Sequence, residues 1–277
     1  MKTQDRTIKI ANSGYEFDEK AHLHTLDGKP LTGVTTVLSV IAKPALIQWA
    51  ANMACDYIEE KLMFETDWLN VHKADFANLL KEARTAHKKK KESAGTHGTE
   101  VHSLIESHIN KIIEHFDGYA KSLRLYTEQN PSVVKFIEWA KENDVKFLAS
   151  EKHVYSRLMW TGGICDIICE IDGKRYVGDI KTSSAIYPEH FIQASAYAEM
   201  LKEMGDYKDE HEPMFPTALI LEKLKKPAFD GVVIINLDKK GGFDVKFNYD
   251  LEGNLNCFKA ALTLYRHLIE VKNQSLN

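Results

Sequence analysis

The stretch 161-TGGICDIICEIDGKRYVGDIKTSSAIYPEHFIQASAY-197 predicts, in order, a strand, a tight turn, a second strand, a loop and a helix. Its first run, residues 164–171, is apolar apart from Asp166 and Glu170. Asp172-Gly173 is typical of the two-residue turn that closes a β-hairpin. The second run, residues 175–180, then returns along the first, so we expect a hairpin followed by a helix.

Three polar side chains of this hairpin, Asp166, Asp179 and Lys181, are expected to lie close together. Because the side chains of a strand alternate between its two faces, Asp179 and Lys181 lie on one face and Ile180 points into the core. If the two strands pair, Asp166 of the first strand lies across from that face. The hairpin therefore predicts two carboxylates and one amine at one place.

This arrangement has two interpretations. Two carboxylates at close range repel each other, and a divalent cation would relieve that repulsion. Oxygen ligands favour Mg²⁺ or Mn²⁺, and a neighbouring lysine can orient or deprotonate a water or stabilise charge on a phosphate. The alternative is an exposed hairpin with a surface salt bridge, because D-x-K triplets are common by chance.

Further motifs stand on either side of the hairpin. Upstream, 95-GTHGTEVHSLIESHI-109 predicts a helix that opens at Gly98-Thr99 and carries His102 and Glu106 one turn apart on one face. Downstream, Gln193 and Tyr197 have the same spacing on a second predicted helix. The ordered set is G-T-x-x-H-x-x-x-E, G-G-x-x-D, D-x-K-T-S and Q-x-x-x-Y.

This ordered set resembles the RecB-like branch of the PD-(D/E)xK nuclease superfamily, which includes phage exonucleases and the mitochondrial genome-maintenance exonuclease. The motifs span Gly95 to about Leu201, a little over a third of the chain. The resemblance implies an α/β fold with a restriction-endonuclease-like core. In that core, helices flank a mixed central sheet, and a helical N-terminal portion precedes it.

The resemblance also implies roles for individual residues. Lys181 would serve the attacking water, and Gln193 and Tyr197 would support the site and the nucleic-acid backbone near it. Two further acids, Glu106 and Glu151, are weaker candidates for an accessory role. The implied ligands of Mg²⁺ or Mn²⁺ are His102, Asp166, Asp179 and the backbone carbonyl of Ile180.

The implied activity is that of a metal-dependent DNA exonuclease in phage-type recombination, replication or repair. Its partner would be DNA, as single strands or ends, with a single-strand-binding or annealing protein as a further candidate. Three alternatives stay open: a structure-specific endonuclease, a non-catalytic DNA-binding or assembly protein that keeps the fold, and a hydrolase of another phosphate ester.

Composition is compatible with this activity. The chain has 277 residues, 44% hydrophobic and 27% charged, with a formal net charge of −4. That balance is ordinary for a soluble globular protein and argues against broad non-specific coating of DNA, but a local basic channel remains compatible with it. We expect one domain over 1–277, with N-terminal strands and a helical wall over 1–95 and the catalytic core over 96–277.

Candidate DNA contacts lie at two places. The basic run Lys88, Lys89, Lys90 and Lys91 ends a helix predicted over 67–91, and Ser93-Ala94-Gly95 is expected to separate that helix from the one carrying His102. A basic end also suits a helix C-terminus, so a purely solvated surface is the alternative. Thr182 and Ser183, which follow Lys181, are the other candidates.

The four cysteines indicate no disulfide framework and no iron–sulfur cluster, because they are too scattered. Cys165 and Cys169 have an even spacing on the predicted strand and are expected to share one face as buried thiols. A reducing, cytoplasmic setting fits best. The sequence shows neither a membrane span nor a secretory signal.

The other expected elements follow from apolar periodicity and turn residues. They comprise strands at 6–11, 22–26, 145–155, 218–221, 232–237 and 243–249, a turn at Asp27-Gly28, and helices at 44–62, 132–143 and 251–271.

Overall fold

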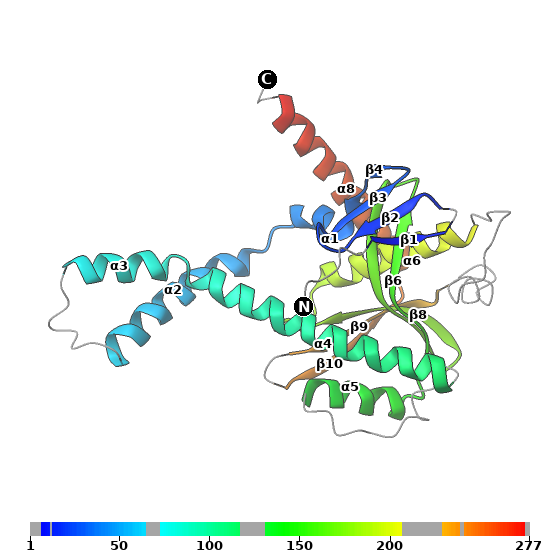
Figure 1. Ribbon diagram of the computed structural model, residues 1–277, viewed down its shortest axis with the longest axis horizontal. Helices are drawn as coiled ribbons and strands as arrows, with labels where there is room; N and C mark the ends of the chain where they lie inside the picture. Colours follow the sequence, from blue (N-terminus) through cyan, green and yellow to red (C-terminus); the bar gives the residue numbers. More distant parts are fainter. Residues whose placement is uncertain are drawn as a thin grey trace. The chain divides into compact units, whose positions relative to one another are not determined.

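The computed structural model describes residues 7–11, 13–64, 73–116, 131–206, 229–238 and 241–274 of the 277-residue chain. The chain divides into two compact units (Figure 1). One comprises Met1–Ile41 and Val101–Asn277, and the other comprises Ala42–Glu100. The expectation of one domain over 1–277, with parts meeting at residue 95, stays a prediction.

The strands are β1 (Thr7–Ile10), β2 (Tyr15–Asp18), β3 (Leu23–Leu26), β4 (Lys29–Pro30), β5 (Thr32–Gly33), β6 (Lys146–Ser156), β7 (Thr161–Ile171), β8 (Lys174–Lys181), β9 (Gly231–Leu237) and β10 (Phe243–Asn248). The helices are α1 (Val34–Val37), α2 (Pro44–Phe64), α3 (Lys73–Ala83), α4 (Ala86–Phe116), α5 (Pro131–Glu142), α6 (Pro188–Asp206) and α8 (Leu251–Gln274), with a 3₁₀ turn at Leu38–Val40.

The larger unit is built on a six-stranded sheet with the order β10-β9-β8-β7-β5, in which β6 also pairs with β7. The β8–β9 and β5–β7 pairs are parallel, and the others are antiparallel. The sheet is therefore mixed, and helices cover both of its faces (Figure 1). This confirms the predicted α/β class.

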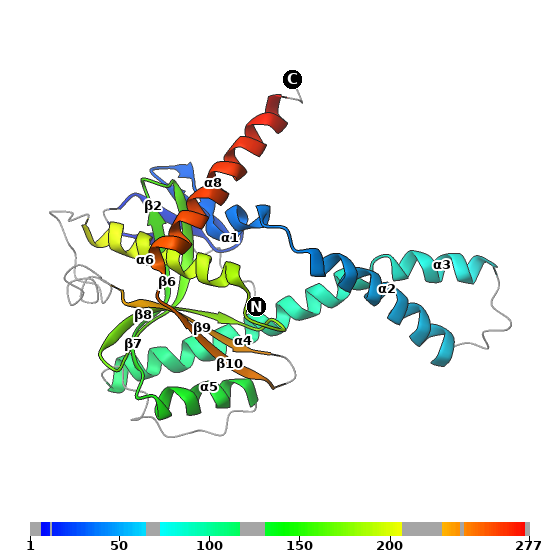
Figure 2. The same ribbon diagram turned by 180° about the vertical axis from the view of Figure 1, so that it is seen from behind.

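Each face of the sheet has its own hydrophobic cluster. On one face, Val101, Ile105 and Ile109 of α4 pack with α5 and with Ile167 and Ile180 of the sheet. Their spacing of four residues places them on one side of the helix, as an amphipathic helix requires. The other face packs against α6, α8 and the N-terminal strands (Figure 2).

The hairpin predicted from residues 164–180 is confirmed. Strands β7 and β8 pair from Ile167↔Gly178 to Ile171↔Lys174. Asp172 and Gly173 both have positive φ, 50° and 73°, which is the backbone of a two-residue hairpin turn. The expected helix follows the second strand as α6.

A four-stranded antiparallel meander, β1-β2-β3-β4, precedes the main sheet. The turn predicted at Asp27-Gly28 is present, with φ values of 50° and 72°. Strand β2 was not expected from the sequence, because Asn12-Ser13-Gly14 and the acids around it favour a loop. Its inward residues Tyr15 and Phe17 are nevertheless buried.

One helix boundary was predicted wrongly. Helix α4 runs without interruption from Ala86 to Phe116, through the expected break at residues 93–95, and the break lies at Arg84-Thr85 instead. Each of the two glycines in this stretch, Gly95 and Gly98, costs a helix only about 1 kcal/mol, which the alanines, lysines and glutamates around them offset. Inside α4, the Thr96 and Thr99 hydroxyls donate to the carbonyls four residues earlier, at 3.2 and 3.1 Å.

The smaller unit contains α2, α3 and the first half of α4. Helices α2 and α3 pack together, and the Tyr57 hydroxyl donates a hydrogen bond to the Glu82 carboxylate. The basic run Lys88–Lys91 is exposed on the first turns of α4, at the N-terminal end of a helix and not at the predicted C-terminal end. Its contact with DNA stays a prediction.

The remaining expected elements agree with the structure within two residues at most ends. The helices predicted at 44–62, 132–143 and 251–271 correspond to α2, α5 and α8, and the strands at 232–237 and 243–249 correspond to β9 and β10. The strand expected at 218–221 lies outside the described residues. Among those described, no single helix is long and apolar enough to cross a membrane; only a bent pair, Val34–Val40 with Pro44–Met63, passes by length and composition.

Candidate active site

The candidate site forms where strands β7 and β8 part. Along one edge, β7 pairs with β5 at Thr161 and Gly162 and with β8 from Ile167 onward. Within the described residues, 163–166 therefore have no strand partner on that edge. Strand β8 continues beside β9 as far as Lys181↔Asn236. The two strand segments that carry the predicted carboxylates thus diverge instead of closing against each other.

Asp166 of β7 links the two strands across the point where they diverge. Its Oδ2 accepts a hydrogen bond of 2.7 Å from the Ile180 backbone N–H. The Ile180 side chain is buried in the cluster beneath the sheet, so its neighbours on β8 face the other way. The expected placement of Asp166 near Asp179 and Lys181 is confirmed.

Four side chains form what we call the lysine network: Asp179, Lys181, Gln193 and Tyr197. The Lys181 Nζ lies 2.6 Å from Asp179 Oδ2 and donates to Gln193 Oε1 at 3.3 Å. The Gln193 Nε2 lies within hydrogen-bonding distance of Asp179 Oδ1, at 3.2 Å, and of the Tyr197 hydroxyl, at 3.1 Å. Helix α6 thus brings the predicted Gln–Tyr pair directly onto the D-x-K triplet.

The glycines ahead of Asp166 make room for this helix. A Cβ at Gly163 would lie 2.5 Å from Cε1 of the Tyr197 ring. Real Cβ atoms do not approach a ring so closely, so a larger residue would displace Tyr197. The second glycine of the G-G-x-x-D motif is therefore required because a side chain at this position would clash with Tyr197.

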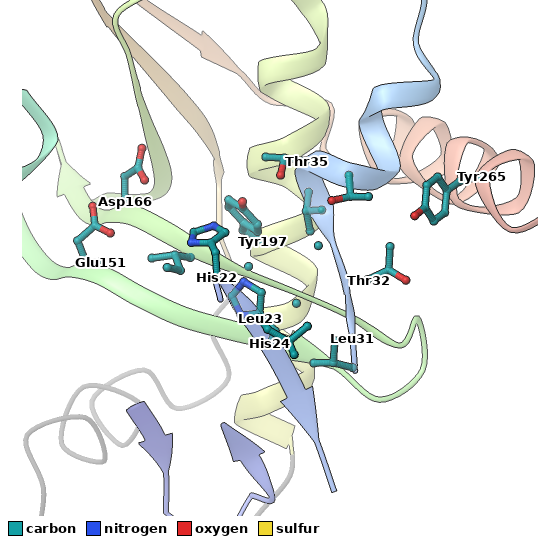
Figure 3. A pocket seen from close by; sticks show the side chains of 16 residues that line it. His22, Leu23, His24, Leu31, Thr32, Thr35, Glu151, Asp166, Tyr197 and Tyr265 are labelled. Atoms are coloured by element: carbon teal, nitrogen blue, oxygen red, sulfur yellow. The ribbon is translucent and has the colours of Figure 1, made fainter. Parts of the chain in front are cut away.

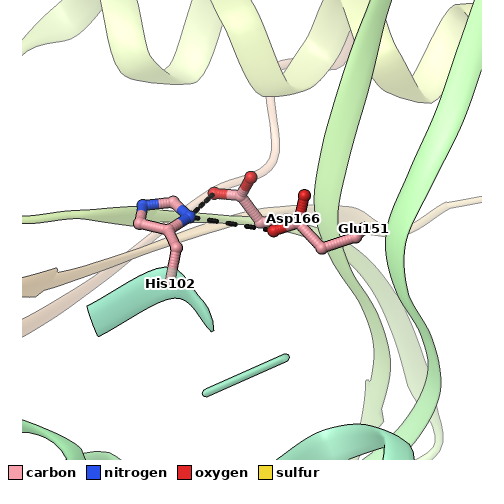
Figure 4. Close-up of side chains that lie close together, drawn as sticks. All are labelled: His102, Glu151 and Asp166. Atoms are coloured by element: carbon pink, nitrogen blue, oxygen red, sulfur yellow. Dashed lines mark ion pairs between the residues drawn. The ribbon is translucent and has the colours of Figure 1, made fainter. Parts of the chain in front are cut away.

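A second set of side chains, the metal group, comprises His102, Glu151 and Asp166. The Nδ1 of His102 lies 3.8 Å from Glu151 Oε1 and 3.8 Å from Asp166 Oδ2 (Figure 4). One ligand atom from each of the three lies within 4.8 Å of the other two. The three come from α4, β6 and β7, so the fold rather than local sequence brings them together.

Glu151 has an unusual backbone. Its φ is +46°, a left-handed value that costs most L-residues about 1–2 kcal/mol. In the β6–β7 register Glu151 stands opposite Asp166, between the pairs Ser150↔Ile167 and Lys152↔Cys165, but it is not itself one of the paired residues. Strain of this kind, held at a strand centre beside a polar cluster, is typical of functional sites. The sequence marked Glu151 only as a weak accessory acid.

The other predicted ligands are arranged differently. The Asp179 carboxylate is occupied by Lys181 and Gln193, and it is not one of the three converging ligands in the described part of the chain. Glu106 is half-buried one turn along α4 from His102 and is likewise outside that group. Metal binding by Asp179 and by the Ile180 carbonyl stays a prediction.

Burial dominates the electrostatics of the acids. It raises the pKa of Asp179 to about 6, against the opposing charge of Lys181. It also raises the pKa of Asp166, although the charges of His102 and Lys181 act in the other direction. A cation held beside these carboxylates would remove much of the penalty for ionising them.

The two basic groups respond to their acidic neighbours. Burial acts to lower the pKa of Lys181, but the carboxylates of Asp179 and Asp166 outweigh it and raise that pKa. For His102, burial likewise acts to lower the pKa, and Glu151 and Asp166 raise it overall. The site therefore holds positive charge against its carboxylates at neutral pH.

The predicted DNA contacts after Lys181 are partly engaged within the protein. The Ser183 hydroxyl lies 2.7 Å from the Ala185 carbonyl, to which it donates, and 3.2 Å from Asn236 Oδ1. Asn236 also donates to the Ser183 carbonyl at 3.0 Å. Thr182 is half-buried. Ser183 thus anchors the loop that leaves β8, and DNA contact by either residue stays a prediction.

The expected shared face of the two strand cysteines is wrong. Both thiols are free and buried, but Cys165 packs in the cluster with α6, and Cys169 packs in the cluster with α4 and α5. The side of the sheet to which the β7 side chains point changes between Cys165 and Ile167, around Asp166, which stands opposite Glu151. The prediction of no iron–sulfur cluster remains untested.

A cavity of about 470 Å³ adjoins the metal group (Figure 3). Glu151, Asp166 and Tyr197 line one side of it. The sequence did not indicate the opposite wall, because its residues are spread over a hairpin, a short helix and the C-terminal helix. That wall includes His22, His24, Thr32, Thr35 and Tyr265.

Comparison with known proteins adds no identification. No model of a known protein family matches the chain, and a search of curated proteins finds no match. The function is therefore inferred from the geometry of the site and from the motif resemblance.

Proposed function

We propose that the chain is a metal-dependent DNA nuclease with a restriction-endonuclease-like core of the PD-(D/E)xK type. The observation that carries the proposal is the meeting of the lysine network with the metal group where β7 and β8 part. Asp166 belongs to the metal group, and its Oδ2 is held 2.7 Å from the backbone N–H of Ile180, between Asp179 and Lys181. A surface salt bridge would need neither the buried aspartate nor the glutamine–tyrosine support.

The donor set of the metal group fits a hard divalent cation. It offers two carboxylates and one imidazole. All three side chains are at least partly buried, and their ligand atoms lie within 4.8 Å of one another. Oxygen-rich sets suit Mg²⁺ or Mn²⁺, and the strained Glu151 backbone supports a ligand role for that residue. When bound, such a cation would supply a water of lowered pKa and positive charge beside a phosphate.

The residues of the lysine network supply the rest of the chemistry. Lys181 can donate hydrogen bonds to a phosphate oxygen or position the attacking water, and Asp179 fixes its ammonium at 2.6 Å. Gln193 holds Asp179 from the other side, and Tyr197 holds Gln193. The network therefore orients its charged groups before any substrate arrives, which favours catalysis by preorganisation.

The motif resemblance supports DNA as the substrate and an exonuclease rather than an endonuclease. The first experiment is cleavage of end-labelled single- and double-stranded linear DNA, beside a closed single-stranded circle, with Mg²⁺, Mn²⁺ or EDTA. We expect metal-dependent loss of the linear DNA while the circle survives.

The other outcomes are equally informative. Cleavage of the circle would make the protein an endonuclease with the same site. Intact DNA under every metal condition, with a folded protein, would overturn the nuclease proposal and favour a DNA-binding or assembly protein that keeps the fold.

A further inference from the structure

The cavity beside the metal group has a wall that the proposed chemistry does not use. Its volume of about 470 Å³ lies within the range of small-molecule sites, about 300–1,000 Å³. Glu151 and Asp166 stand at one side, and the rest is lined by residues of β3, β5, β7, α1, α6 and α8 together with His22 of the β2–β3 loop (Figure 3). There is thus room for a part of the substrate directly next to the reacting phosphate.

The chemistry of the lining favours an uncharged group. None of the sixteen described residues that line the cavity is lysine or arginine. Without a cation, that wall cannot neutralise a phosphate as DNA-backbone sites do. It offers instead imidazole rings, threonine hydroxyls and aliphatic side chains. Rings of this kind stack on bases, and such polar groups bond to base edges and sugar hydroxyls.

One imidazole of the wall is held rigidly. His24 is only 6% exposed, and its Nδ1 lies 2.6 Å from the Tyr15 hydroxyl. The same hydroxyl is 3.1 Å from Nδ1 of His153. Burial lowers the pKa of His24 to about 4, which keeps its ring neutral at pH 7. A fixed, neutral ring is suited to recognising a neutral ligand group.

The second imidazole, that of His22, is exposed and lies edge-on to the Phe17 ring, with the ring centroids 5.2 Å apart. His22 has φ of +49° and is the last residue of the hairpin loop between β2 and β3, whose Asp18 and Leu23 are paired. The loop is already closed by Asp18 Oδ1, which accepts from the Lys20 and Ala21 N–H groups at 2.9 and 2.8 Å. Glycine or asparagine would meet this backbone with less strain. A strained residue whose side chain lines a cavity suggests a function for that side chain.

We propose that this cavity binds the nucleoside of a single unpaired nucleotide whose phosphate lies at the metal group, with His22 contacting the base. The inference rests on the proposed nuclease function and names the part of the substrate that the site recognises. A base still held in a duplex cannot present its face and edges to this wall. The enzyme therefore acts on single strands or on frayed ends.

Two phosphodiesters with the same leaving group test the proposal. Thymidine 5′-(4-nitrophenyl phosphate) carries a nucleoside, and bis(4-nitrophenyl) phosphate does not. Both depend on the same metal group and release the same 4-nitrophenolate. We expect wild-type protein to have a higher kcat/KM for the nucleoside ester, and this preference should fall about tenfold in His22→Gly, as expected for one lost base stack.

His22→Gly is chosen because it relieves the left-handed backbone strain, which offsets the loss of the ring contact with Phe17. Asp172→Gly is the matched control, since its φ of +50° is nearly the same and it lies in the β7–β8 turn, outside the cavity lining. The control should keep the full preference. A wild-type protein without preference, or an unchanged preference in His22→Gly, would overturn the inference while leaving the nuclease proposal intact.

Calorimetric titration with thymidine 5′- and 3′-monophosphate in the presence of Mn²⁺ covers the case in which neither ester is cleaved. Binding of either nucleotide by wild-type protein, weakened in His22→Gly and not in Asp172→Gly, would support the cavity as a nucleoside site even if hydrolysis fails. Absence of binding by wild-type protein, or equal binding by both variants, would overturn the inference.

Discussion

The two halves of the candidate site differ in how far their polar groups are already satisfied. In the lysine network, the linked atoms lie 2.6–3.3 Å apart and each side chain has a partner. In the metal group, His102 stands 3.8 Å from each of its two carboxylate neighbours, beyond hydrogen-bonding distance. The first half is assembled in advance, whereas the side chains of the second are held further apart, as the proposed cation site requires.

The backbone shows the same difference. Asp179 and Lys181 lie on a regular strand that pairs with β9 at both positions. Glu151 has a left-handed backbone in the middle of β6, and the pairing with β7 skips it. The positions of Asp179 and Lys181 in the lysine network therefore follow from ordinary sheet geometry. The metal group, in contrast, forms only because the backbone of β6 is distorted at Glu151.

The largest expected effect is on the lysine network. Lys181→Ala should lower the rate of metal-dependent DNA cleavage by at least about a thousandfold, because it removes the only ammonium described within the network. Single-turnover rates on linear DNA measure the change. Lys174→Ala, at the exposed start of β8, is the control and should keep the wild-type rate. Cleavage by Lys181→Ala at near the control rate would remove this residue from the mechanism.

A pH dependence of stability should also come from the network. The pKa of Asp179 rises from 3.8 to about 6 on folding, so the folded protein binds that proton more tightly than the unfolded chain. The contribution to stability is full below about pH 4 and is lost as the pH rises to 6, by up to about 3 kcal/mol.

Urea unfolding in EDTA between pH 4 and 7 measures this loss. Asp179→Asn cannot titrate at that position and should show a shallower fall in the free energy of unfolding over the same range. If the free energy of unfolding changes with pH equally in the two proteins, the Asp179 carboxyl keeps an ordinary pKa. The lysine network would then be more exposed to solvent than in the structure.

The metal group should respond through cation affinity. Glu151→Gln removes one carboxylate charge and should weaken Mn²⁺ binding about 10- to 100-fold, measured by calorimetry. Glu106→Gln changes an acid one helical turn from His102, outside the group, and should have little effect. Equal losses in both variants would mean that Glu151 has no special place in the site.

The sequence predicted the network better than the metal group. Alternation along β8 is enough to put Asp179 and Lys181 on one face, and helical spacing is enough to put Gln193 beside Tyr197. Both relations are local, so a residue pattern carries them. The α/β class and the β7–β8 hairpin were predictable for the same reason.

What the sequence missed depends on long-range geometry. The role of Glu151 follows from its left-handed backbone and from its place opposite Asp166 in the sheet, which no local pattern records. The uninterrupted α4 shows that a serine–alanine–glycine segment alone does not end a helix. The wall with His22 and His24 comes from a hairpin more than a hundred residues away from Glu151 in the sequence.

The smallest expected effect comes from the backbone strain at Glu151. The test is the sign of the difference in free energy of unfolding between two variants at this position. At an ordinary strand position glycine is less stable than alanine by about 0.5–1 kcal/mol. Where φ is +46°, the order should reverse, because glycine alone avoids the clash of a Cβ with the backbone. Glu151→Gly should therefore exceed Glu151→Ala in free energy of unfolding by about 1 kcal/mol in urea titrations.

Both variants lose the carboxylate, so any effect of charge on stability cancels between them and only the backbone term remains. If alanine proves the more stable, Glu151 sits in an ordinary strand, and the structural reason for counting it as a ligand is lost. If glycine is the more stable while both variants bind Mn²⁺ equally poorly, the strain belongs to the backbone and the affinity to the carboxylate. The fold would then be holding a strained residue in place for the sake of its side chain.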